Sequence, residues 1–173
     1  TMARQTAISI NTIPIGPLGI IGMPGCDELT DKIDKYLVKW RKTQASEHAE
    51  SIAFFGYQRD TYKIDVSIPR FGSGEGKGVI NESVRGYDIY IVCDVFNYSC
   101  SYDMYGRKVY MSPDDHFADL KRVISALCSK PKRVSVIMPM LYEGRQHKRS
   151  SRESLDCAMA LKELVHLGVE NII

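Results

Sequence analysis

The sequence predicts an α/β protein in which a parallel β-sheet carries helices on both faces. Two apolar runs, residues 87–96 and 132–141, have the length and continuous apolar character of strands that are covered on both sides. Helical segments with one apolar face alternate with these runs, and the connections are short. Such alternation is typical of a three-layer fold built on a parallel sheet. The 173 residues suffice for one domain with its own core.

The elements of the first half follow in chain order. The segment "IPIGPLGIIGMPG" (residues 13–25) predicts a short strand between Gly and Pro residues. The next segment predicts a helix whose apolar face, at helical spacing, is made of Leu29, Ile33, Tyr36, Leu37 and Trp40. Residues 51–71 alternate between apolar and polar well enough for one or two strands, until "GSGEGKG" ends the pattern.

The second half continues the alternation. Residues 97–115 are irregular and rich in Tyr, Ser and Asp, which predicts a long loop with a small hairpin. The segment "FADLKRVISALC" (residues 117–128) predicts a helix with Pro113 and Asp114 at its start, before the apolar run at 132–141. A further helix is predicted from about residue 152 to residue 167, with Ser150 or Ser151 as its N-cap. "VENII" then begins another strand.

Composition narrows the class of protein. Hydrophobic residues at 44% and charged residues at 25% are globular values, and a net charge of +2 argues against bulk binding of nucleic acid. The five cysteines form no zinc spacing and mostly lie in apolar runs, as free thiols do in a reducing compartment. The sequence contains no signal peptide and no apolar stretch of about 20 residues. We therefore expect a cytoplasmic protein that binds neither nucleic acid nor membranes.

The segment "RQHKRSSR" (residues 145–152) is the strongest local concentration of positive charge, with four Arg or Lys among eight residues. It follows a predicted buried strand, and ligands of parallel sheets bind outside the carboxyl ends of the strands. It also leads into a predicted helix N-terminus, whose free N–H groups favour anions. A phosphate site and a solvated surface loop are both compatible with this segment.

The segment "RFGSGEGKG" (residues 70–78) resembles a phosphate loop only superficially. Gly78 follows Lys77 where a Walker motif requires Ser or Thr, and Lys77 occupies the place of the third glycine of a dinucleotide fingerprint. Phe71 and Glu75 are more informative than the glycines. A purine ring needs an apolar face to stack on, and its exocyclic amine needs an acceptor.

Two further polar segments have simpler alternatives. Ser83 and Arg85 lie in "NESVRGYD", which is either a site or a polar turn that enters a strand. "SPDDHF" (residues 112–117) contains paired acids and a His, which suits either a Mg²⁺ site or a helix cap. We interpret it as a cap, because Asp near a helix start is routine. No nucleophilic or zinc-hydrolase motif is present, so the residues alone indicate a phosphate or nucleotide site without specifying a reaction.

Taken together, the segments resemble the N-terminal domain of the ribose-phosphate pyrophosphokinase (phosphoribosyl pyrophosphate synthetase) family. The matching segments are colinear from residue 70 to the end: "RFGSGE", "NESVRGYDIYIV", "SPDDHFADLKRVISAL", "RVSVIMPMLYEGRQHKRSSRES" and "GVENII". The resemblance implies a phosphoribosyltransferase-like three-layer domain. The tract from 97 to 111 is longer here than in the short forms of the family.

The resemblance also implies an activity. Enzymes of that family transfer the diphosphoryl group of Mg²⁺-bound ATP to the 1-hydroxyl of ribose 5-phosphate, and they form homo-oligomers. Residues 1–173 would be the ATP-contributing N-terminal domain. The C-terminal domain, which binds ribose 5-phosphate and completes the Mg²⁺ site, would be absent, so we expect the isolated domain to be inactive.

The resemblance assigns roles to individual residues. It implies no catalytic residue and no metal ligand in this chain, and an ATP site made of Phe71, Ser73, Glu75, Arg145, Gln146 and His147. An allosteric phosphate or ADP site would use Ser83, Arg85 and Arg152. Ser73 stands where the family has Asn or Asp, and His147 replaces an Asp. These two departures favour the alternative of a non-catalytic, synthetase-associated regulatory homologue. A third alternative, a stand-alone nucleotide-binding module, is favoured only by the absence of a second domain from these residues.

Overall fold

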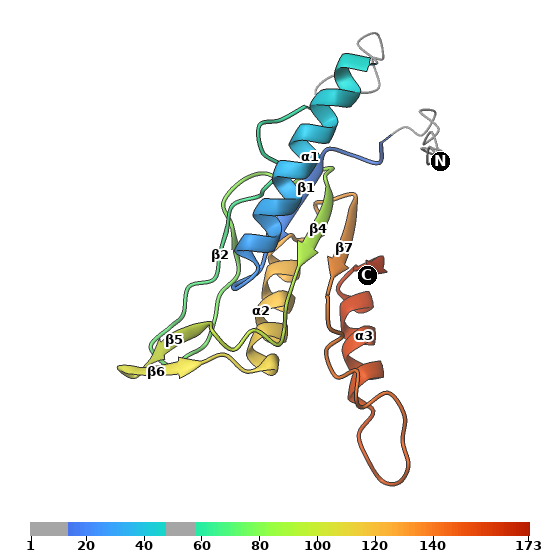
Figure 1. Cartoon of the computed structure of the whole chain (residues 1–173). Helices are drawn as coiled ribbons and strands as arrows, with labels where there is room; N and C mark the ends of the chain where they lie inside the picture. The colour runs from blue at the N-terminus through green and yellow to red at the C-terminus, as the bar shows by residue number, and fades with distance from the viewer. Residues whose placement is uncertain (1–13, 48–57) are drawn as a thin grey trace, which may run out of the picture.

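The computed structural model describes residues 14–47 and 58–173. Its central sheet has the strand order β1-β4-β7-β8, and every neighbouring pair is parallel (Figure 1). The predicted buried runs form the two middle strands. The bounds of the strands are Leu18–Gly22 for β1, Asp88–Val92 for β4, Arg133–Ile137 for β7 and Asn171–Ile172 for β8.

Helices cover both faces of this sheet, as the sequence predicts. Helices α2 (Pro113–Ala126) and α3 (Asp156–His166) pack on one face, where their apolar side chains join Ile89, Ile91 and Val136 in the larger core cluster. Helix α1 (Asp27–Glu47) packs on the other face, around Ile20 and Tyr62. The three-layer α/β prediction is confirmed. None of the helices in the described ranges is long and apolar enough to cross a membrane.

The predicted apolar face of α1 is partly wrong. Leu29, Tyr36 and Trp40 are exposed, whereas the polar residues Thr30 and Asp34 are buried against the sheet side. Burial of a polar group is tolerated when it is hydrogen-bonded. The Thr30 hydroxyl donates to the Cys26 carbonyl, and the Asp34 carboxylate accepts from the Thr61 hydroxyl and the Tyr62 N–H. These bonds rotate the helix away from the face that apolar spacing alone selects.

The starts of the other two helices differ in how well the sequence locates them. Ser112 caps α2 by accepting from the Asp115 N–H, and the Asp115 carboxylate accepts from the Ser112 N–H in return. The capping interpretation of "SPDDHF" is therefore confirmed. Helix α3 begins at Asp156 without a side-chain cap, so the predicted start near residue 152 is wrong. The hydroxyls of Ser150 and Ser151 donate to Glu153 inside the loop instead.

Two small antiparallel pairs complete the fold. Strand β2 (Val66–Ser67) pairs with β3 (Val79–Ile80), and β5 (Ser101–Met104) pairs with β6 (Arg107–Tyr110). The second pair is the small hairpin predicted between residues 97 and 115. Of the strands predicted over 51–71, residues 51–57 lie outside the described residues. The remainder contributes β2 and two isolated bridges, from Lys63 to Ile20 and from Arg70 to Gly76.

The burial of the cysteines predicts one fast-reacting thiol per native chain. Cys128 is exposed, whereas Cys26, Cys93 and Cys157 are buried and Cys100 is half-buried. Burial also raises the pKa of Cys26, Cys93 and Cys100, which lowers their thiolate fraction. Titration with a chromogenic disulfide reagent should show one fast thiol in the native chain and all five in denaturant.

Replacement Cys128→Ser should abolish the fast phase and leave the denatured count lower by one. A second fast thiol in the native chain would contradict the burial described here.

Candidate functional site

The predicted base-binding residues lie in one tight turn, residues 70–76, which we call the Phe71 turn. The Phe71 N–H donates to the Glu75 carbonyl at 2.8 Å, and the Gly74 N–H donates to the Phe71 carbonyl at 2.8 Å. Gly74 has a φ of +91°, a conformation that a side chain would strain. The Ser73 hydroxyl donates to the Glu75 carboxylate at 2.7 Å. The Phe71 ring is 58% exposed, so the turn presents an apolar ring and an oriented carboxylate to solvent.

A buried ionic cluster fixes the Phe71 turn to α2. The Asp119 carboxylate accepts from Arg70 at 2.6 Å and from Arg122 at 2.5 Å. The Asp119 side chain is 2% exposed and that of Arg70 is 11% exposed, so the pair is shielded from water. Burial raises the pKa of the Asp119 carboxyl, and the two guanidinium groups oppose this rise. The cluster gives the turn a rigid connection to the core.

The hairpin β5–β6 packs against the other side of the turn. The Tyr105 N–H donates to the Gly72 carbonyl at 2.9 Å. The Arg70 guanidinium lies over the Tyr102 ring, 4.4 Å from its centroid. A Cβ atom at Gly74 would lie 3.0 Å from the Met104 sulfur, which shows how closely the two segments approach. The turn is therefore held between α2 and the hairpin.

The predicted phosphate-binding residues lie in a second element, the basic loop (residues 141–155), which follows β7. Its first part is anchored to α2: the Tyr142 ring stacks on Phe117 with centroids 4.2 Å apart, and its hydroxyl donates to the Asp114 carboxylate at 2.6 Å. Burial raises the pKa of Tyr142, and the bond to Asp114 adds to the rise. The phenol therefore remains a donor over the physiological pH range.

Within the basic loop, the three predicted ATP contacts have different environments. Arg145 is exposed to solvent. The Gln146 side-chain amide donates to the Ser154 carbonyl at 2.9 Å, and a ring nitrogen of His147 lies 3.0 Å from the Gly144 carbonyl. Gln146 and His147 thus help to shape the loop, while Arg145 is open to an anion.

The structure does not bring the two halves of the predicted ATP site together within one chain. Figure 1 shows the hairpin, against which the Phe71 turn packs, and the basic loop beyond the carboxyl ends of the strands but far apart, with α2 between them. Nor do the predicted allosteric residues meet. Ser83 and Arg85 are exposed before the start of β4, at the amino end of the sheet, whereas Arg152 lies in the basic loop near the opposite end.

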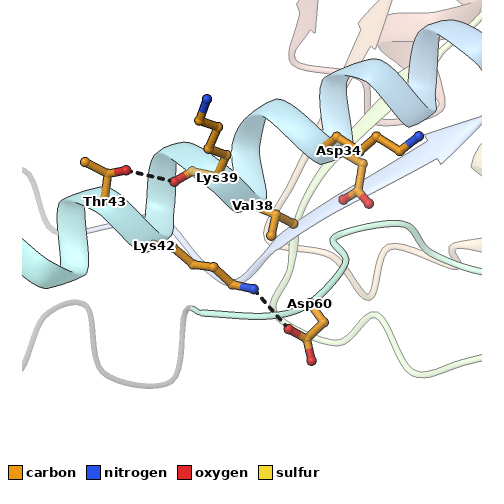
Figure 2. Close-up of a pocket in the computed structure, with 7 residues that line it drawn as sticks. Asp34, Val38, Lys39, Lys42, Thr43 and Asp60 are labelled. Carbon is orange, nitrogen blue, oxygen red and sulfur yellow. Dashed lines mark hydrogen bonds and ion pairs between the residues drawn. The ribbon is translucent and has the colours of Figure 1, made fainter.

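A shallow groove of about 560 Å³ lies between α1 and the segment at Asp60, and sequence reasoning did not identify it. Figure 2 shows Lys42 reaching across it to Asp60, at 3.4 Å. Lys35 and Lys39 lie one helical turn apart along the same wall. The Asp34 carboxylate in this wall is already used by Thr61 and Tyr62. We assign no chemistry to the groove, because its charges form an open helix surface.

Residues 18–168 match the family described as the N-terminal domain of ribose phosphate pyrophosphokinase. The chain belongs to this family. It is 27% identical over 128 residues to ribose-phosphate pyrophosphokinase 1 of Schizosaccharomyces pombe, an alignment that covers 73% of this chain and 28% of the yeast protein.

A solved structure has the same fold. The chain superposes on the crystal structure of phosphoribosylpyrophosphate synthetase from Mycobacterium smegmatis with a TM-score of 0.62 and 20% identity. The match covers 90% of this chain and 41% of that one, and at this identity it shows the fold alone. The chain thus spans less than half of the length of either protein.

The Mg²⁺ that the resemblance implies has no ready ligand set in the described part of this chain. Across residues 14–47 and 58–173, no group of three or more His, Cys, Asp and Glu side chains could hold a metal ion.

The Asp119 cluster predicts a large loss of stability when its carboxylate is removed. Asp119→Ala leaves the guanidinium of Arg70 buried without its partner, which should lower the free energy of unfolding by about 3–5 kcal/mol. Glu163→Ala, which breaks an exposed pair with Lys121, is the matched control and should cost about 1 kcal/mol or less. Urea unfolding measures both. Equal, small losses would show that the cluster does not stabilise the turn.

Proposed function

We propose that this chain is the ATP-contributing domain of an enzyme that transfers diphosphate from Mg²⁺-bound ATP to the 1-hydroxyl of ribose 5-phosphate. The observation that carries the proposal is the Phe71 turn, where an exposed aromatic ring and an oriented carboxylate are held on a rigid support. An adenine ring stacks on aromatic side chains, and its exocyclic amine donates to a carboxylate. The turn offers both partners with little loss of conformational entropy.

The residues of the proposed ATP site have distinct tasks. Phe71 supplies the stacking surface and Glu75 accepts from the exocyclic amine of adenine. Ser73 orients that carboxylate through its hydrogen bond. Arg145 contacts the phosphates, because a guanidinium offers paired donors to phosphate oxygens. Gln146 and His147 hold the loop that carries Arg145.

The separation of the Phe71 turn from the basic loop supports a shared site. In the proposed enzyme, a homo-oligomer, the Phe71 turn of one subunit meets the basic loop of another. Ribose 5-phosphate and most Mg²⁺ ligands would belong to a second domain, and the chain alone would be inactive. Its match to only 28% of the yeast relative is consistent with this division. The buried free thiols support a cytoplasmic location.

A second candidate function is that of a non-catalytic regulatory homologue that binds nucleotide. The observation that favours it concerns Ser73 and His147, the two residues that depart from the family motif: both make hydrogen bonds within the protein. Ser73 donates to Glu75 at 2.7 Å, and His147 lies against the Gly144 carbonyl at 3.0 Å. Both side chains are thereby committed within the protein. A stand-alone nucleotide-binding module needs the same contacts.

The proposal also includes an allosteric site. Ser83, Arg85 and Arg152 would bind a phosphate or ADP there.

The proposed ATP contacts predict a specific pattern of binding losses. Phe71→Ala removes the stacking ring and Arg145→Ala removes the phosphate contact, so each should weaken binding of Mg²⁺-ATP about tenfold. Tyr98→Ala and Lys132→Ala remove an exposed ring and an exposed cation elsewhere, and should leave binding unchanged. Isothermal titration calorimetry of the four variants checks this. Undiminished binding by both Phe71→Ala and Arg145→Ala would contradict the assignments.

Mixing two variants that each bind Mg²⁺-ATP weakly tests whether the site is shared between copies. In a dimer formed from Phe71→Ala and Arg145→Ala chains, one site carries both changes and the other carries neither. After subunit exchange, roughly a quarter of all sites should therefore regain the parent affinity. If both contacts came from one chain, mixing would restore no binding. Calorimetric stoichiometry of the mixture distinguishes the two arrangements.

A further inference from the structure

The tip of the hairpin holds an aromatic residue in an unfavourable place. Tyr105 and Gly106 form a two-residue turn between β5 and β6, with φ values of 49° and 75°. Turns with two positive φ angles favour Asn-Gly or Asp-Gly, because side chains other than Gly, Asn and Asp are strained there. Tyr105 is also 80% exposed, so its ring gains little from packing within the chain. Neither the turn nor the core explains why a Tyr occupies this position.

The position of Tyr105 relative to the Phe71 turn suggests a reason. Its N–H donates to the carbonyl of Gly72, the residue after Phe71. Two further contacts hold the hairpin against the Phe71 turn: Met104 lies close to Gly74, and Arg70 lies over the Tyr102 ring. Phe71 and Tyr105, whose side chains are both exposed, therefore lie on backbone segments that are hydrogen-bonded to each other and held by the same contacts.

We propose that Tyr105 is a second aromatic contact of the nucleobase and contributes to the affinity for a nucleoside triphosphate over a ligand without a base. The inference rests on the proposed function, since it concerns the same ligand. A flat base offers two faces and an edge, and one ring at Phe71 can cover only one of them. Aromatic contacts with nucleobases are favourable and tolerate a range of bases. A contact between the Tyr105 ring and the base would thus offset the backbone strain at Tyr105 when the ligand is bound.

Other exposed tyrosines of this region lack the same relation to the turn. Tyr110 lies at the far end of β6, paired with Ser101 at the base of the hairpin, and Lys108 covers its ring at 5.3 Å. It is 61% exposed and belongs to the same hairpin, which makes it a matched control.

The test compares ATP with inorganic tripolyphosphate, which lacks the base, as ligands of the 173-residue chain. Tyr105→Asn removes the ring but suits the turn and keeps the N–H that donates to Gly72. It should weaken ATP binding about fivefold or more, leave tripolyphosphate binding unchanged, and leave the midpoint of thermal unfolding equal or higher. Tyr105→Phe should bind ATP like the parent chain, as should Tyr110→Ala.

Each alternative result has a defined meaning. If Phe71→Ala weakens ATP binding and Tyr105→Asn does not, the role of Tyr105 is refuted while the proposed function stands. If Tyr105→Asn weakens ATP and tripolyphosphate equally, the loss is not a base contact and the inference also fails. If the parent chain does not discriminate ATP from tripolyphosphate, it has no base site, and the proposed function fails together with the inference.

Discussion

The ion pairs of the buried Asp119 carboxylate are the interactions on which the position of the Phe71 turn depends. This carboxylate is shared by two guanidinium groups, one from its own helix and one from the Phe71 turn. Removing a carboxylate from water is costly and is offset only while both partners remain in place. The penalty for separation therefore keeps the turn against α2. Since Arg70 also lies over the Tyr102 ring, the same carboxylate indirectly positions the hairpin.

A second ionic contact fixes the opposite end of the sheet. Arg133 donates to both oxygens of Asp88, its direct neighbour across the parallel pair β4–β7. Planar, two-point contacts of this kind are sensitive to geometry, so they favour a single strand register. Between the two ends lies an apolar core in which Ile89, Ile91 and Val136 are fully buried. The binding elements thus emerge from a sheet whose register is fixed by charge at one end and by packing in the middle.

Sequence reasoning predicted the parts of the fold that depend on local pattern. The middle strands, the hairpin and the cap at Ser112 all follow from neighbouring residues. The buried face of α1 could not be predicted in this way. Asp34 is buried because it accepts hydrogen bonds from Thr61 and Tyr62, and the spacing of apolar residues along the helix gives no sign of these bonds. The start of α3 was placed too early because serines that suit a cap bond to Glu153 within the loop instead.

The residues of the candidate site could be predicted from the sequence, but the contacts that support them could not. Phe71 and Glu75 could be selected from the sequence because their side-chain chemistry suits a purine and the segment matches a family motif. Their support could not, since Arg70 and Asp119 are 49 positions apart and nothing in either segment marks the pair. The contact of the hairpin with the turn is a backbone bond to Gly72, and backbone bonds between distant segments leave no signature in side-chain identity.

The hydrogen bond that closes the base of the hairpin β5–β6 makes this hairpin structurally independent of the chain on either side of it. The Met111 N–H donates to the Cys100 carbonyl at 2.9 Å, so the chain leaves and re-enters the body of the domain at adjacent points. The cap of α2 begins immediately afterwards, at Ser112. Length and sequence between these two points can therefore change without altering the path of β4 or the start of α2. During evolution, the tip of such a hairpin can be replaced while the sheet that carries it stays the same.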